Sequence, residues 1–135
     1  MELIQWSEKY EIGIEEIDNQ HRGLIIIINE LFELMSKGKA KDKLPEIFEH
    51  LTEYTKKHFS TEEIMMVKYA YPERDNHKNE HQKFIQKLTD LRKDFTNNKI
   101  TISIEVLNFL KEWLLNHILI SDKKYVGHIE NFRKE

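Results

Sequence analysis

The sequence predicts an all-α protein, folded as an up-down-up-down antiparallel four-helix bundle with an N-terminal arm and a short C-terminal extension. Apolar residues recur at spacings of three and four through four long segments, and the alternation typical of strands is absent. Short connections separate these segments, and short connections favour antiparallel neighbours. At 135 residues, with only 4 Gly and 2 Pro, the chain fits one domain over residues 1–135.

The first two helices are bounded by recognisable start and stop signals. The first is predicted over about residues 18–37, ending near Gly38. The second is predicted to begin after Asp42, which can serve as its N-cap, and to end near residue 68. Pro45 then falls in the first turn, where proline is tolerated.

The third and fourth helices follow breaks of the same kind. A break at residues 69–72 precedes a helix that starts between residues 72 and 76 and runs to about residue 96. Asn97 and Asn98 end it. The fourth helix is predicted over about residues 103–120, followed by a polar C-terminal extension.

Composition excludes several classes of protein. The formal net charge of -3 comes from 21 basic and 24 acidic residues spread along the chain, so we expect no nucleic-acid partner. The absence of cysteine excludes disulfides, thiolate metal sites and iron–sulfur clusters. The N-terminus lacks the pattern of a secretion signal, and the longest aliphatic run, residues 24–28, is too short to span a membrane. We therefore expect a soluble, cytoplasmic protein.

Five of the seven histidines fall on the inward stripes of the predicted helices. In an antiparallel bundle the start of the first helix, the end of the second, the start of the third and the end of the fourth meet at one end. The side chains brought together there are His21, His58, Glu62, His77, His81, His117 and Asp122. The other two, His50 and His128, lie off the stripe and in the polar extension, and we assign them no metal role.

The spacing of these side chains favours a metal site. Five imidazoles are costly to bury without compensation. His58 and Glu62 lie one turn apart, as do His77 and His81, so each pair can reach one centre from its own helix. Asp122 follows at the frayed end of the fourth helix, where the chain can turn its carboxylate inward.

Nitrogen and oxygen donors without thiolates suit iron, manganese, cobalt, nickel, copper or zinc. Seven side chains are too many for one ion. Two roughly octahedral ions, bridged by Glu62, Asp122 and one solvent-derived oxygen, would use all but one of about twelve coordination positions. The count leaves one position open, on one metal.

Four segments and Trp6 resemble the hemerythrin family, and in particular its bacterial single-domain members, the bacteriohemerythrins. The segments are residues 12–21, 58–63, 77–81 and 117–122. All seven ligand positions of the family pattern are filled. The resemblance implies two iron ions joined by a bridging oxo or hydroxo group.

The resemblance also implies a role for each residue. His77, His81 and His117 would hold the saturated iron, His21 and His58 the iron with the open position, and Glu62 and Asp122 would bridge the two. Molecular oxygen would bind at the open position. Met66, Trp113 and Leu114 would line the oxygen pocket, although each is also an ordinary core residue.

Reversible oxygen binding, for storage, transport or delivery, is the function we expect, because histidines are neutral donors and supply little charge to stabilise high-valent iron. Glu63 and Glu80 lie off the inward stripes and read as solvated, so the sequence offers no positioned acid or base. The alternatives are a di-iron oxidase, peroxidase or nitric oxide reductase, and an oxygen- or iron-sensing module. The sensing module is disfavoured because no output domain is attached.

Four consecutive isoleucines, residues 25–28, span most of the circumference of the first helix. At least one is expected to point away from the core. Either the arm around Trp6 covers it, or the helix mediates a homo-oligomer.

Overall fold

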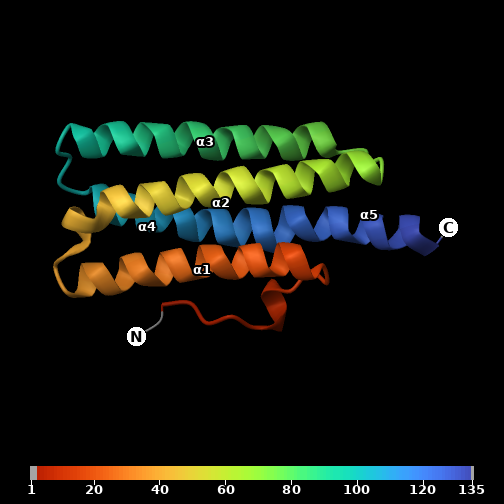
Figure 1. Ribbon diagram of the computed structural model, residues 1–135, viewed down its shortest axis with the longest axis horizontal. Helices are drawn as coiled ribbons and strands as arrows, with labels where there is room; N and C mark the ends of the chain where they lie inside the picture. Colours follow the sequence, from red (N-terminus) through yellow and green to blue (C-terminus); the bar gives the residue numbers. More distant parts are fainter. Residues whose placement is uncertain (1–2, 135) are drawn as a thin grey trace.

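The computed structural model describes residues 3–134 and contains helices and no strand over that range (Figure 1). In chain order the elements are η1 (Glu8–Tyr10), α1 (Glu15–Ser36), α2 (Ala40–Lys68), α3 (Arg74–Thr96), α4 (Ile102–Trp113), η2 (Leu114–Asp122) and α5 (Lys123–Lys134). The last three run on without interruption as one long helix. The connections lie at alternate ends of the bundle, so the predicted up-down-up-down topology is confirmed (Figure 1).

The first three long helices end in the same way, with one residue in the left-handed region. These residues are Gly38, Ala70 and Asn98, with φ of 69°, 51° and 61°. After α1, the N–H of Lys39 donates to the carbonyl of Leu34, and matching bonds follow α2 and α3. This is the Schellman arrangement, in which two backbone bonds satisfy the last carbonyls of a helix. All three predicted breaks are confirmed.

Two helix starts differ from the prediction. α1 begins at Glu15, three residues before Asp18, and the Asp18 carboxylate bonds the preceding arm instead of capping the helix. That carboxylate accepts the backbone N–H groups of Ile12 at 2.8 Å and Gly13 at 3.3 Å. Gly13 has φ of 90°, which a side chain would strain.

The second helix also begins earlier than predicted. α2 starts at Ala40, so Asp42 is not its N-cap. Asp42 lies in the first turn, where its negative charge favours the positive end of the helix dipole. Pro45 consequently lies beyond the first turn, inside the helix, where the backbone loses one hydrogen bond.

Buried apolar side chains form two clusters that lie against opposite sides of the buried histidines. The larger cluster fills most of the bundle and includes Phe48, Leu51, Phe84 and Leu110. The smaller cluster lies toward the C-terminus and consists of Ile12, Ile17, Met66, Tyr71, Tyr125, Val126 and Ile129.

The C-terminal segment is not the polar extension that the sequence suggested. It forms α5, with Tyr125, Val126 and Ile129 buried in the smaller cluster. The helix that precedes it is not frayed near Asp122. It widens into the π-helical segment η2, whose i to i+5 bonding the sequence analysis did not anticipate.

The N-terminal arm packs beside α1. The backbone N–H and C=O of Ile4 bond the amide of Asn29 at 2.9 and 2.8 Å, and the guanidinium of Arg22 lies 4.5 Å from the ring centroid of Trp6. Ile26 nevertheless remains 65% exposed, so one isoleucine of residues 25–28 does point away from the core. In residues 3–134, no helix is both long and apolar enough to cross a membrane.

Candidate metal centre

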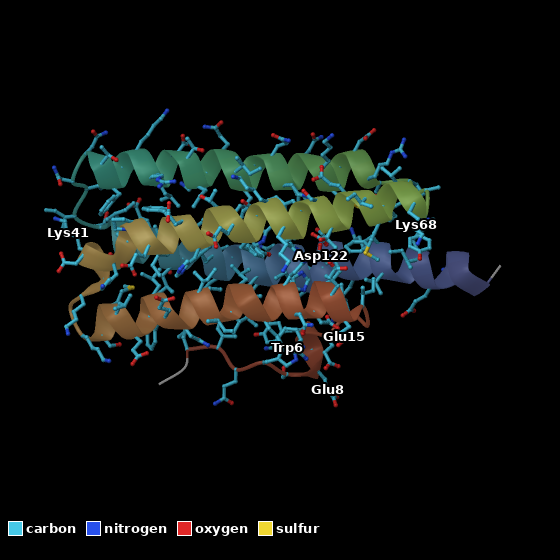
Figure 2. All side chains as sticks on the ribbon, viewed as in Figure 1. Trp6, Glu8, Glu15, Lys41, Lys68 and Asp122 are labelled. Carbon is cyan, nitrogen blue, oxygen red and sulfur yellow. The ribbon has the colours of Figure 1, made fainter. Side chains whose placement is uncertain are left out.

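The structure brings all seven predicted side chains together, although they come from positions a hundred residues apart. α1 supplies one, α2 and α3 two each, and η2 the last two. They are His21, His58, Glu62, His77, His81, His117 and Asp122. None is more than 4% exposed. Figure 2 shows Asp122 between the helices, in the half of the bundle nearer Lys68 than Lys41.

The Asp122 carboxylate lies between the two groups of histidines. Its Oδ2 is 2.9 Å from Nε2 of His21 and 3.9 Å from Nε2 of His58. Its Oδ1 is 3.0 Å from Nε2 of His77 and 2.9 Å from Nε2 of His117. Each oxygen therefore faces a different half of the cluster.

Glu62 also contacts both halves. Its Oε1 lies 2.8 Å from Nε2 of His58 and 3.2 Å from Nε2 of His81. Its Oε2 lies 3.7 Å from Nε2 of His77. The Nε2 atoms of His21 and His58 face each other at 3.2 Å.

These atoms form two overlapping groups with the dimensions of metal sites. One contains Glu62 with three histidines of α3 and η2, and the other contains Glu62 and Asp122 with two histidines of α1 and α2. Within each group the potential ligand atoms lie within 4.8 Å of one another. Atoms bound at about 2.1 Å to one octahedral ion lie about 3 Å apart in cis positions and about 4.2 Å apart in trans positions.

Buried polar atoms without a hydrogen-bond partner indicate whether a metal ion would fit the cluster. Within the described chain, both oxygens of Glu62, both oxygens of Asp122 and Nε2 of three histidines are buried without a hydrogen-bond partner of suitable geometry. Buried polar atoms are ordinarily satisfied, so their concentration here calls for a further partner. Cations bound by nitrogen and oxygen would supply it.

The two buried carboxyls are held in the ionised form. Burial raises the pKa of Glu62, but the charge of His58 and the contacts with His117, His58 and His77 outweigh it and hold that pKa well below its usual range. For Asp122, burial and the neighbouring Glu62 charge are outweighed by His117 and His21, so the pKa is again well below its usual range.

The pKa values of three histidines in the cluster shift in different directions. Burial lowers the pKa of His77, but contacts with Asp122 and Glu62 raise it to about 9. His117 has a pKa raised well above its usual value, because the same two carboxylates overcome its burial. For His81 burial dominates and lowers the pKa. Without an ion, protons on imidazoles balance the carboxylates, and a cation can replace them.

The π-helical segment explains how Asp122 reaches the centre. In a regular α-helix, residues five apart differ by about 140° in direction, so His117 and Asp122 could not both face inward. In η2 the bonding runs from i to i+5, which stacks such residues one turn apart. The wide π-helical turn therefore directs the Asp122 carboxylate inward, which the sequence analysis had attributed to a frayed helix end.

Polar partners outside the cluster orient two of its histidines. Oε2 of Glu80 lies 2.9 Å from Nδ1 of His117, and Oε1 of Gln20 lies 2.7 Å from Nδ1 of His58. The Glu80 side chain is 43% exposed, in agreement with its interpretation as solvated, but it also meets a ring nitrogen of the cluster, which the sequence analysis did not anticipate. A long side chain one position off the inward stripe can still reach a ring nitrogen. The hydrogen bond from His117 lowers the pKa of Glu80.

Aromatic rings pack on the imidazoles and seal the centre from one side. Trp113 stacks on His117 with ring centroids 3.9 Å apart, and Phe59 stacks on His81 at 3.8 Å. On the other side, the ring of Tyr125 meets that of His77 edge to face at 5.3 Å. Burial raises the pKa of Tyr125 well above its usual value. The sequence analysis missed Tyr125, although it follows Asp122 by three residues.

The three predicted pocket residues are buried but do not share one cluster. Met66 belongs to the smaller apolar cluster, whereas Trp113 and Leu114 belong to the larger one. The cluster of histidines lies against both.

The two remaining histidines lie outside the centre. His50 is exposed, with Nδ1 3.9 Å from Glu30. His128 is half-buried, and its Nε2 donates to the backbone carbonyl of Tyr69 at 2.7 Å. Its ring therefore fastens α5 to the end of α2, which the description of a polar extension did not foresee.

Comparison with known proteins identifies the family. Residues 12–129 match the model of the hemerythrin HHE cation binding domain. A bacteriohemerythrin of Clostridium acetobutylicum is 34% identical over 128 residues, covering 92% of this chain and 99% of that protein. A myohemerythrin of Theromyzon tessulatum is 33% identical over 128 residues, covering 95% of each chain.

A solved structure has the same fold. The crystal structure of a hemerythrin mutant superposes with a TM-score of 0.84 at 27% identity, covering 95% of this chain and 98% of that one. The family match, the relatives and the shared bundle agree, and the chain belongs to the hemerythrin family.

Proposed function

We propose that this chain binds molecular oxygen reversibly at a non-haem di-iron centre. In this proposal His77, His81 and His117 hold one ion, His21 and His58 hold the other, and Glu62 and Asp122 bridge them. A bridging oxo or hydroxo group would complete the pair.

The observation that carries the proposal is the division of Asp122 and Glu62 between two groups of histidines. Each oxygen of Asp122 contacts a different group, as a bridge between two ions requires. The unequal numbers of histidines, three and two, leave one coordination position open on the second ion when both ions are roughly octahedral. When bound, the two irons supply electrons and that open position to oxygen.

The side chains around the centre support binding more than turnover. Five neutral imidazoles and only two carboxylates give the ions little anionic stabilisation. Stacked Trp113 and Phe59, together with buried Leu114, keep bulk water from the donor atoms. Glu80 and Gln20 accept hydrogen bonds at the outer ring nitrogens and leave the inner nitrogens free to bind. The names of the relatives, bacteriohemerythrin and myohemerythrin, agree with this function.

The test is anaerobic reconstitution with ferrous iron, followed by metal analysis and visible spectra. We expect two irons per chain, a visible absorption band on exposure to oxygen, and loss of that band on degassing over repeated cycles. Irreversible conversion to a ferric form, or catalytic consumption of oxygen, peroxide or nitric oxide, would contradict reversible binding and favour an enzyme. A single zinc ion per chain would contradict the di-iron centre.

A homo-oligomer through α1 is a separate prediction, prompted by the exposed side chain of Ile26. Sedimentation at high protein concentration, with Ile26→Lys as the matched variant, tests it. A protein that stays monomeric at all concentrations would contradict the predicted homo-oligomer.

A further inference from the structure

The two halves of the cluster differ in the group that meets an outer ring nitrogen. In the three-histidine half, Nδ1 of His117 lies 2.9 Å from a carboxylate oxygen of Glu80. In the two-histidine half, Nδ1 of His58 lies 2.7 Å from the amide oxygen of Gln20. The positions are equivalent, but one partner is an anion and the other is neutral.

Both oxygens of Glu80 are engaged. Oε2 meets His117, and Oε1 accepts the hydroxyl of Ser121 at 3.0 Å. An ionised carboxylate only accepts hydrogen bonds, so Nδ1 of His117 carries a proton and Nε2 is the nitrogen left to bind an ion in exchange for its own proton. A second carboxylate, Glu63, lies 3.8 Å from Nδ1 of His81 in the same half.

The neutral partner is equally well oriented. The Thr61 hydroxyl donates to the backbone carbonyl of Lys57 at 2.8 Å, and Gln20 Nε2 donates to the Thr61 oxygen at 3.1 Å. This chain of bonds turns the amide oxygen toward His58. The other histidine of this half, His21, has a buried Nδ1 without a hydrogen-bond partner among the described residues. No anion therefore meets an outer nitrogen in this half of the described structure.

We propose that Glu80 and Gln20 make the two positions unequal in their affinity for an ion. Glu80 strengthens binding at the three-histidine position, and Gln20 leaves the two-histidine position weaker and its ion more readily exchanged. A carboxylate that accepts the outer N–H makes an imidazole a stronger donor, and an amide does so less. Both side chains act as positioning residues, through His117 and His58. The inference rests on the metal-binding part of the proposed function and adds an order of loading.

Exchanging the two partners tests the inference without measuring oxygen binding. Metal-free protein is titrated with Co²⁺ in competition with a chelator, and the two steps are followed by cobalt absorption. We expect two ions to bind in separate steps. Glu80→Gln should weaken the tighter step about tenfold and leave the weaker step nearly unchanged. Gln20→Glu should tighten the weaker step by a similar factor.

Three control variants separate this effect from others. Asp90→Asn and Gln86→Glu make the same changes of charge on the exposed face of α3, where Gln86 Nε2 donates to Asp90 Oδ1 at 3.0 Å. Ser121→Ala removes one of the two contacts of Glu80 with η2 and keeps the other, with His117. Circular dichroism and melting of the metal-free variants report whether they fold.

The outcomes are distinct. Affinities that change equally in the Asp90 or Gln86 control would mean long-range charge and would overturn the inference. An effect of Ser121→Ala equal to that of Glu80→Gln would mean that only the register of η2 matters, and would also overturn it. If Glu80→Gln does not fold, Gln20→Glu decides alone. If the wild-type protein does not bind two ions, the result would instead contradict the proposed function.

Discussion

The two ends of the bundle bury opposite kinds of side chain. Near the turns at Gly38 and Asn98 the interior is apolar, with Leu44, Phe48 and Ile102 at most 1% exposed. Toward the other end seven titratable side chains are buried together, with the smaller apolar cluster beyond them. The remaining buried polar side chains of the described residues, Asp18 and Thr55, each lie three residues before a cluster histidine. The apolar end can stabilise the fold without an ion, and the polar end has nitrogen and oxygen atoms that bound cations would satisfy together.

The largest effect is expected from removing a shared carboxylate. Glu62→Ala takes away the one side chain that belongs to both groups of candidate ligands, so both ions should lose affinity and reversible oxygen binding should disappear. Metal analysis after reconstitution and oxygen spectra measure this. Retention of two irons with a normal spectrum would show that Glu62 is no bridge.

The apolar end should respond in stability and not in metal content. Phe48 is fully buried, so Phe48→Ala should lower the free energy of unfolding by about 3–5 kcal/mol through lost contacts and a cavity. Denaturant titration gives the stability, and metal analysis of the folded fraction should still give the wild-type ratio. A fall in that ratio would mean that the two ends are not separable.

Metal affinity should fall as the solution becomes more acidic. The pKa of His77 is raised to about 9, so below about pH 9 an ion must displace a proton from it; the pKa of His117 is also raised, so an ion competes with a proton there as well. The apparent affinity should drop by up to about tenfold per pH unit for each proton displaced. Chelator competition at pH 6, 7 and 8, with proton release followed in weak buffer, measures it. A metal affinity that does not change with pH would show that the ion does not displace protons from these two histidines.

The smallest effect is expected at a histidine outside the cluster. His50→Ala removes an exposed imidazole 3.9 Å from Glu30, so stability should change by less than about 0.5 kcal/mol. Metal content and oxygen spectra should equal those of the wild type. Loss of an ion in this variant would require a ligand set different from the one proposed.

Much of the fold and of the cluster could be predicted from the sequence, because both follow from helical periodicity. Inward positions repeat every three or four residues, and an antiparallel bundle then brings the histidines together whatever their separation in the chain. The turns at Gly38 and Asn98 could be predicted for a different reason. Few residue types tolerate a positive φ, and glycine and asparagine are the two that most often end a helix in this way.

The features that could not be predicted depend on local departures from that periodicity. The spacing of five between His117 and Asp122 suggested an irregularity, but a π-helical turn and a frayed end give the same signal. Glu80 and Gln20 were missed because a stripe marks where a Cβ points and not how far a long side chain reaches. α5 was missed because three buried residues make a weak pattern among charged ones.

The widened turn in η2 couples two parts of the protein that otherwise look unrelated. A helix lacking one residue between His117 and Asp122 could return to regular winding and still direct both side chains inward, now four residues apart. Tyr125 follows Asp122 by three residues, so α5 would keep its orientation, and Tyr125, Val126 and Ile129 would still face the smaller cluster. The wide turn thus absorbs one surplus residue, and its winding sets the direction of the Asp122 carboxylate and the phase of the C-terminal helix together.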